Sequence, residues 1–65
     1  MTVGEKIREL REKEGISLRT LAHILGKDPA QISRWENGIQ TPSIYSLRAV
    51  AFALKADIND FIELL

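Results

Sequence analysis

Residues 16–38, with the sequence ISLRTLAHILGKDPAQISRWENG, decide the fold of this chain. A short helix is predicted after Ser17, because serine is a favoured N-cap and apolar residues then recur at helical spacing. These apolar residues are Leu18, Leu21, Ala22 and Leu25. Gly26 follows, and glycine readily takes the positive φ that ends a helix. The small Ala22 allows a following helix to cross closely over the first one.

A second helix is predicted over Pro29–Asn37. Asp28 is expected to cap it, proline suits the first helical position, and Gln31 completes a capping box of the form D-x-x-Q. Ile32 and Trp35 share one face at i and i+3, so both are expected in the core. Two helices crossed around a short glycine turn form a helix-turn-helix, whose second helix is able to enter the DNA major groove.

Three further helices complete the predicted domain. Thr2 and Glu5 form a capping box that opens a helix with an inner face of Val3, Ile7 and Leu10. Ser43 caps another helix, whose expected buried residues are Ile44, Leu47, Val50, Ala51 and Leu54. Asp57 caps a last helix that contains Ile58, Phe61, Ile62 and Leu65. Residues 1–65 are therefore expected to fold as a single all-α domain of five helices.

The composition excludes several classes of protein. The chain has 65 residues and no cysteine, so neither a disulfide framework nor a thiolate metal site is expected. No segment approaches the ~20 apolar residues of a membrane span, and the N-terminus shows no signal-peptide pattern. No nucleophile–base pair, carboxylate pair or metal-binding cluster shares a face. We therefore expect a cytoplasmic protein that is not an enzyme and that binds no metal, cofactor, membrane or small-molecule ligand.

The charge distribution suits a weak attraction to a polyanion. The net charge is zero, with nine basic and nine acidic side chains. Residues 16–55 nevertheless carry five basic side chains against two acidic ones, whereas residues 56–65 carry three acidic side chains and no basic one. The segment with the predicted helix-turn-helix is therefore mildly basic, and its attraction to DNA phosphates is expected to be present but weak.

Several short motifs together resemble one known family. They are IREL-R at residues 7–11, Gly15 with Ser17, Leu21 with Ala22, Gly26, ISRWENG at residues 32–38, and Pro42 with Ser43. As a set they resemble the Cro and phage-repressor type of helix-turn-helix domain, often called Xre-like, over almost the whole chain. The resemblance implies a compact five-helix fold of the phage-repressor type and a repressor-like transcriptional regulator. It also implies sequence-specific binding to double-stranded DNA, with a homodimer on a palindromic operator.

The resemblance places the DNA-facing positions on the exposed side of the helix predicted over Pro29–Asn37. Arg34 is expected to read bases, because its guanidinium is able to bond guanine O6 and N7 together. Ser33 offers a short hydroxyl and Ala30 a methyl group for further base contacts. The expected phosphate contacts are Ser17, Arg19, Lys27, Gln31, Asn37 and Ser43.

Two further features receive structural or assembly roles. By resemblance, Glu36 pairs with Arg11 of the first helix and holds the predicted recognition helix in place. Separately, Tyr45, Ala49 and Phe52 form a stripe at i, i+4 and i+7, off the core face of their helix. Phe52, Ile62 and Leu65 are interpreted as an exposed apolar patch that forms a dimer interface. The competing interpretation is that the C-terminal helix folds back and covers this patch.

An alternative function from a different class stays open. In this alternative the fold is kept, but the apolar surface of the last two helices binds a partner protein, as an antitoxin binds its toxin. The zero net charge favours it, as does Leu18, which stands where the family often has a phosphate-binding glutamine. Arg34, Asn37 and Lys27, which replaces a usually apolar residue, favour DNA.

Overall fold

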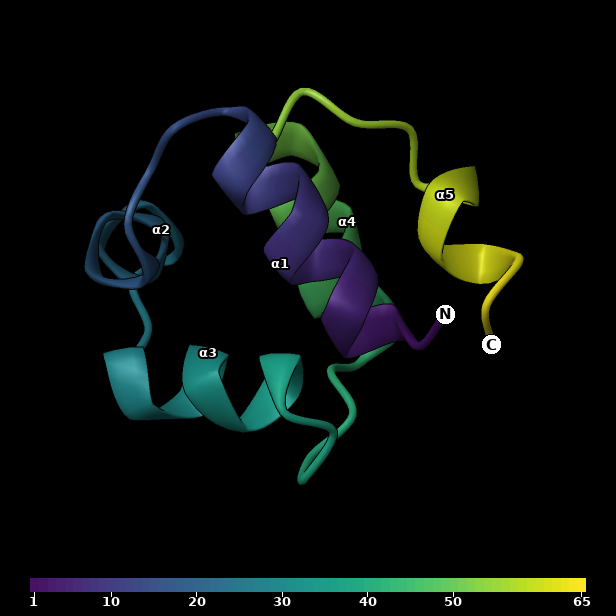
Figure 1. The fold of residues 1–65 in the computed structure, drawn as a ribbon, viewed down its shortest axis with the longest axis horizontal. Coiled ribbons are helices and arrows are strands. Elements are labelled where there is room, and N and C mark those ends of the chain that lie inside the picture. Colours follow the sequence, from purple (N-terminus) through teal and green to yellow (C-terminus); the bar gives the residue numbers. More distant parts are fainter.

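Five α-helices make up the structure, a computed structural model that describes all of residues 1–65 (Figure 1). They are α1 (Val3–Lys13), α2 (Leu18–Leu25), α3 (Pro29–Glu36), α4 (Ile44–Ala53) and α5 (Asn59–Ile62). The molecule measures 26 × 24 × 19 Å. It contains no strand, so the predicted all-α architecture is confirmed. Crossing a bilayer would require a longer apolar helix than any of the five.

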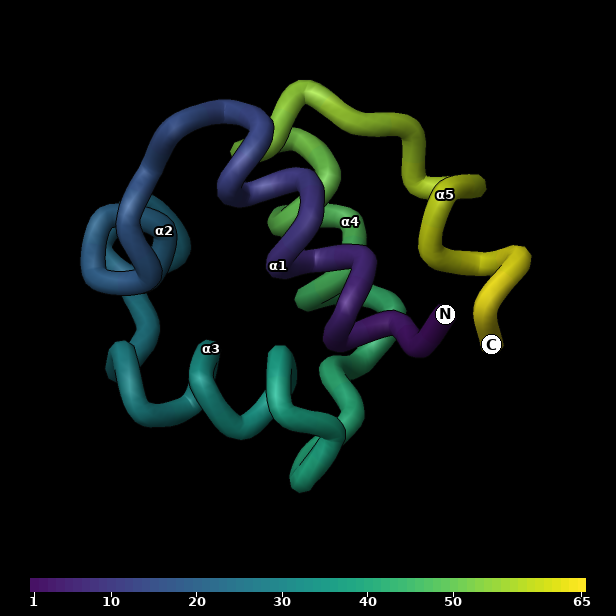
Figure 2. The backbone as a smooth tube through the Cα atoms, in the orientation of Figure 1, coloured from purple at the N-terminus to yellow at the C-terminus, as the bar shows by residue number.

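Local capping signals set most of the helix ends. Thr2 Oγ1 accepts a hydrogen bond from the Glu5 backbone N–H at 3.1 Å, and the Thr2 N–H donates to Glu5 Oε1 at 2.8 Å. The capping box predicted at the start of α1 is therefore present. Gly26 ends α2 in the left-handed region, at φ 65° and ψ 34°. Figure 2 shows the short connection that follows α2 and leads into α3.

The core joins all five helices. It contains twelve buried apolar residues: Val3, Ile7, Leu10, Leu21, Ala22, Ile32, Trp35, Leu47, Val50, Ala51, Leu54 and Phe61. Helix α3 packs against α2 and α1, α2 also contacts α4, and α5 contacts α1. In Figure 1, α3 lies along one edge of the molecule, at the side opposite the linker that joins α4 to α5. One long side of α3 is therefore held by the core, while its other side is left open.

Gly4 explains how closely α1 approaches α3, and the sequence did not single it out. A Cβ atom at Gly4 would collide with the backbone carbonyl oxygen of Trp35 and would lie 2.8 Å from that of Glu36. Only a residue without a side chain permits this approach. The contact therefore sets the position of the C-terminal part of α3.

Three predictions about the C-terminal half need correction. Ile44 was expected to be buried, but it is 42% exposed, because it is the first residue of α4 and lies at the edge of the packed region. The last helix spans only Asn59–Ile62, so Ile58 and Leu65, which were both expected in it, lie outside it. Asp57 was expected to cap this helix, but the N-cap residue is Ile58, and Asp57 accepts a hydrogen bond from the Asn59 N–H at 2.9 Å from one position further out. A helix this short has little stability of its own, and the fully buried Phe61 anchors it.

Candidate nucleic-acid interface

Helix α3 begins where the sequence predicted, although its cap is simpler. Asp28 Oδ1 accepts a hydrogen bond from the Ala30 N–H at 2.8 Å, and Pro29 occupies the first helical position. The expected capping box is absent, because the Gln31 side chain does not return to the Asp28 backbone. Gln31 contributes only its backbone N–H, which donates to the Asp28 carbonyl at 2.9 Å. The helix ends at Glu36, with Asn37 as its C-cap rather than as its last residue.

The two sides of α3 differ sharply in burial. Ile32 and Trp35 are 0% and 2% exposed, so both lie in the core as predicted. On the other side, Ala30 and Arg34 are exposed and Ser33 is half-buried. The three residues predicted to contact bases thus lie on one helix, away from its core face.

Glu36 is the only buried charged residue, and two arginines of α1 neutralise it. Arg11 donates from Nε to Glu36 Oε2 at 2.7 Å and from Nη2 to Oε1 at 3.0 Å. Arg8 donates from Nε to the same Oε1 at 3.2 Å. The hydrogen bond to Glu36 raises the pKa of Arg11 above its usual value, against the opposing effect of burial. Arg11 also donates from Nη1 to the Ile16 carbonyl at 3.0 Å, so it joins α1 to the segment before α2.

Arg8 was missed by the sequence interpretation. It lies three residues before Arg11, on the same face of α1, and this spacing was the signal that could have found it. Its Nη2 donates to Asn37 Oδ1 at 3.0 Å. Asn37 in turn donates from Nδ2 to Ser33 Oγ at 3.2 Å. The exposed Asn37 side chain, predicted to contact phosphate, is therefore held between α1 and α3.

Two of the predicted phosphate contacts are N-cap serines. Ser17 Oγ accepts from the Thr20 N–H at 3.0 Å and donates to Thr20 Oγ1 at 2.9 Å. Ser43 Oγ makes the equivalent contacts to Ser46, at 3.1 Å to the N–H and 3.2 Å to the hydroxyl. Both hydroxyls are thus engaged within their own helices. The groups left for a phosphate are the first backbone N–H groups of α2 and α4, which have no partner inside the helix.

The basic side chains predicted to face DNA carry no internal partner. Arg19, Lys27 and Arg34 are exposed, and none of them forms an ion pair within the chain. Gln31 is half-buried. The positive charge of this region therefore remains available to an external anion.

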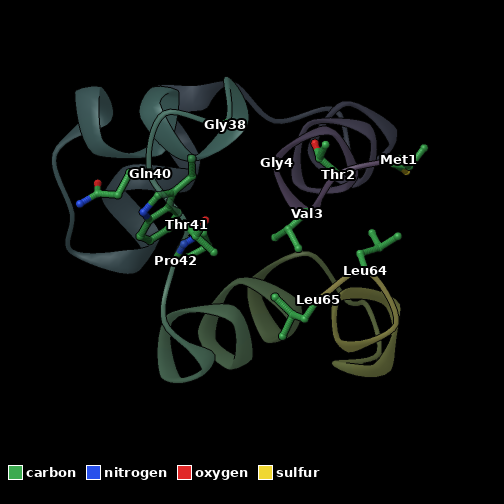
Figure 3. A pocket seen from close by; sticks show the side chains of 11 residues that line it. Met1, Thr2, Val3, Gly4, Gly38, Gln40, Thr41, Pro42, Leu64 and Leu65 are labelled. Atoms are coloured by element: carbon green, nitrogen blue, oxygen red, sulfur yellow. The ribbon is translucent and has the colours of Figure 1, made fainter.

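The one cavity of the structure lies elsewhere. It has a volume of about 400 Å³ and opens between the start of α1, the loop between α3 and α4, and the C-terminus (Figure 3). Its lining includes Met1, Gln40, Pro42 and Leu65, and it contains none of the residues predicted to contact DNA. No group of three or more potential metal-ligating side chains is present. The candidate site is therefore an exposed helix surface rather than a pocket.

The predicted dimer residues are all exposed, but they do not form one compact patch. Phe52 is 89% exposed, Leu65 68% and Ile62 45%, so α5 does not fold back over Phe52. Phe52 lies in the last turn of α4, whereas Leu65 lines the same cavity as Pro42, which precedes α4. Phe52 and Leu65 therefore lie toward opposite ends of α4, and Figure 1 shows the C-terminus on the side of the molecule where α4 begins. The stripe of Tyr45, Ala49 and Phe52 is open along α4, and Tyr45 is 78% exposed.

Comparison with known sequences gives two matches. A family model described as helix-turn-helix matches residues 7–61. An uncharacterized HTH-type transcriptional regulator of Sinorhizobium fredii (strain NBRC 101917 / NGR234), y4wC, is 31% identical over 61 residues. The match covers 94% of this chain but 43% of that relative. The chain thus spans less than half the length of the curated relative.

Comparison with solved structures also gives close likenesses. The structure of SinR, a master regulator for biofilm formation, in complex with DNA superposes with a TM-score of 0.87 and 31% identity. That superposition covers 94% of this chain and 98% of the SinR chain. The P22 c2 repressor protein in complex with a synthetic operator superposes with a TM-score of 0.86 and 30% identity, over 94% and 92% of the two chains. These likenesses confirm the five-helix fold of the phage-repressor type that the sequence predicted.

Proposed function

This chain belongs to the helix-turn-helix family, and we propose on that premise that it binds double-stranded DNA and regulates transcription. The observation that carries the proposal is the contrast between the two sides of α3. Its inner side is held by the core and by the buried Glu36, while Arg34 stands exposed and unpaired on its outer side. The similar structures of SinR and the P22 c2 repressor are both bound to DNA. The rival function, an interaction module of the antitoxin type, is not favoured by these comparisons.

In the proposed complex, α3 enters the major groove. Arg34 bonds the O6 and N7 atoms of a guanine, Ser33 contacts a neighbouring base, and the Ala30 methyl group packs on a thymine. The flanking phosphates are bound by Ser17, Arg19, Lys27, Gln31, Asn37 and Ser43. Since only a few charges are involved, sequence-independent binding is weak and base contacts carry most of the preference.

A homodimer on a palindromic operator is the proposed assembly. Two recognition helices must lie ~34 Å apart to read two half-sites one turn of B-DNA apart, and a dimer fixes that distance. The proposed interface comprises Phe52, Ile62 and Leu65, with the stripe of Tyr45 and Ala49 joining the two ends of α4. A two-fold contact there leaves α3 free. We further propose that residues 1–65 act as one DNA-binding domain, and that the protein acts in the cytoplasm.

Selection from a random duplex pool tests the DNA-binding proposal. The wild-type protein is expected to enrich a palindromic sequence, and Arg34→Ala is expected to weaken binding to it by ~1–3 kcal/mol and to relax one position per half-site. Lys13→Ala is the control, because it removes an exposed charge of α1 that forms no ion pair. If Arg34→Ala keeps both affinity and preference, Arg34 does not read DNA.

The assembly proposal is tested by Phe52→Asp. Because Phe52 is 89% exposed in the single chain, the variant should fold normally but sediment as a monomer and lose cooperative binding to the full site. A wild-type protein that stays monomeric at high micromolar concentration, both free and on DNA, would refute the dimer.

A further inference from the structure

The side-chain amide of Asn37 has only one available orientation. A guanidinium group carries hydrogen-bond donors and no acceptor. Because Arg8 Nη2 lies 3.0 Å from the Asn37 side chain, Asn37 must present its oxygen to Arg8 and not its NH₂ group. Arg8 is itself held by its bond to Glu36 Oε1 at 3.2 Å, and Glu36 is 3% exposed. The orientation of Asn37 is thus set from α1.

This orientation fills one acceptor position of the Ser33 hydroxyl and leaves its hydrogen free to donate. With its oxygen facing Arg8, Asn37 points its NH₂ group at Ser33 and donates to Ser33 Oγ at 3.2 Å. Serine within a helix often donates its own hydrogen to the carbonyl four residues earlier. Here the bond accepted from Asn37 is the only one that the Ser33 side chain makes. The hydroxyl hydrogen of Ser33 is therefore left without an acceptor inside the protein.

We propose that Arg8 is a positioning residue that, through Asn37, makes Ser33 a hydrogen-bond donor toward DNA. The inference rests on the proposed function, since it assumes that the outer side of α3 meets DNA. The group that Ser33 recognises is an acceptor: a purine N7, guanine O6, thymine O4 or a phosphate oxygen. The N4 amino group of cytosine is itself a donor and cannot accept the Ser33 hydrogen, so cytosine in the contacted position leaves that hydrogen unbonded and is disfavoured.

A direct phosphate contact by Arg8 is the main competing role, because its side chain is 46% exposed. The two roles differ in salt dependence. Loss of a phosphate contact weakens binding to all sequences and lowers the slope of log K against log salt by ~1. Loss of a positioning residue instead weakens the contact that Ser33 makes and changes the preference at that position. The slope of log K against log salt then equals that of a control variant that loses one charge elsewhere on α1.

The first measurement compares Arg8→Met with Lys13→Met. Both variants remove one positive charge from α1, but Lys13 is exposed, forms no ion pair and makes no hydrogen bond to Asn37, whose oxygen is bonded by Arg8. Arg8→Met should still fold, because Glu36 keeps both of its bonds to Arg11, at 2.7 and 3.0 Å. We expect Arg8→Met, and not Lys13→Met, to lose the preference at the Ser33 position of the selected duplex. Arg8→Lys keeps a donor-only group and should retain the preference.

The second measurement asks whether Arg8 acts through Ser33. Ser33→Ala should weaken binding to the selected duplex about five-fold, as expected for one hydrogen bond. Adding Arg8→Met to Ser33→Ala should then cause no further change at that position. A 7-deaza analogue of the contacted purine removes the N7 acceptor and tests a contact to the base edge. A methylphosphonate at the neighbouring phosphate removes a phosphate oxygen and tests a contact to the DNA backbone. Loss of affinity in either arm supports a donor role for Ser33.

A third measurement needs no DNA. In the free protein, one Asn37 side-chain N–H is bonded to Ser33, so the NMR signal of that hydrogen should be displaced from the position of an unbonded asparagine amide. Arg8→Met should return this signal toward the unbonded position, while Lys13→Met should not. Unchanged amide signals, equal affinity of Ser33→Ala and wild type, or a preference for cytosine would each overturn the proposal. A wild-type protein that enriches no sequence would overturn the proposed function and the role of Ser33 in it. The NMR comparison would then still decide whether Arg8 orients Asn37.

Discussion

Substitution of Gly4 by alanine tests how the recognition helix is positioned. The added Cβ atom would meet the Trp35 carbonyl oxygen and would lie 2.8 Å from the Glu36 carbonyl oxygen and 3.0 Å from the Glu36 carbonyl carbon. These are backbone atoms of α3, so no side-chain rotation relieves the contact. The substitution therefore forces α1 and α3 apart, which also strains the bonds between Arg11 and Glu36.

Two opposing effects decide the magnitude. Alanine is favoured over glycine in a helix interior by ~1 kcal/mol, and less in the first turn, where residue 4 lies. Overpacking of a close contact costs about 1–3 kcal/mol, and backbone partners place Gly4 at the upper end of that range. We therefore expect Gly4→Ala to lower the free energy of unfolding by about 2 kcal/mol. A domain of this size has a free energy of unfolding of roughly 3–10 kcal/mol, so the variant should fold but melt roughly 8–16 °C lower.

The assay combines thermal melting with the fluorescence of Trp35. Trp35 is the only tryptophan and is 2% exposed, so displacement of α3 should change its emission in Gly4→Ala. Gly15→Ala is the matched control. A Cβ at Gly15 meets nothing within 4 Å, so its cost arises only from the positive φ of 71° and should leave the emission unchanged. A Gly4→Ala melting temperature at or above that of the wild type would refute the reasoning.

Three further predictions concern stability. Arg11→Met should lower the free energy of unfolding by about 3 kcal/mol, because it breaks a buried ion pair. The double variant with Glu36→Leu should recover much of that loss, and additive losses in urea unfolding would show that the two residues are not coupled. Lys55→Gly should stabilise the domain by about 1 kcal/mol, because Lys55 has a φ of 56°, and an unchanged melting temperature would contradict this. The hydrogen bond from the Thr2 backbone lowers the pKa of Glu5 below 4.5, so the stabilisation by its carboxylate is complete above that pH and is lost as the pH falls through the lowered pKa. Glu5→Gln should therefore flatten the acid limb of the stability profile, and a limb as steep as that of the wild type would exclude Glu5 as its source.

Much of the fold was predictable because its signals are local. Thr2, Ser17, Asp28 and Ser43 each precede a helix and each bond an N–H two or three residues further along. Such bonds depend only on neighbouring residues, so the sequence contains all the information needed to place them. The spacing of Ile32 and Trp35, read the same way, identified the core face of α3 and with it the outer side that carries Arg34.

Predictions from a local pattern failed where residues distant in the sequence decide the contact. The D-x-x-Q pattern after Asp28 was real, but the Gln31 side chain does not bond back to the cap. Ile44 shares the apolar spacing of α4, yet no neighbouring element covers the first residue of that helix. Phe52 and Leu65 were grouped by their chemistry, and the structure adds that they lie toward opposite ends of α4, so their shared interface stays a prediction. By contrast, the Arg11–Glu36 pair, which was taken from the family resemblance, is confirmed, with Arg11 Nε 2.7 Å from Glu36 Oε2.

The sequence by itself determined the helices, the caps that begin the first four of them and the turn at Gly26, since capping and 3.6-residue periodicity act over three or four residues. Only the tertiary structure decided what surrounds the end of α3. The bonds of Arg8 to Glu36 and Asn37 join residues 28 and 29 positions apart, and they exist because Gly4 lets α1 approach the backbone of α3. Helical periodicity does not predict contacts between residues so far apart in the sequence, because these contacts depend on the angle and separation at which two helices cross. The recognition helix was therefore visible in the sequence, whereas the orientation of Asn37 and the role left to Ser33 became visible only once α1 and α3 were packed together.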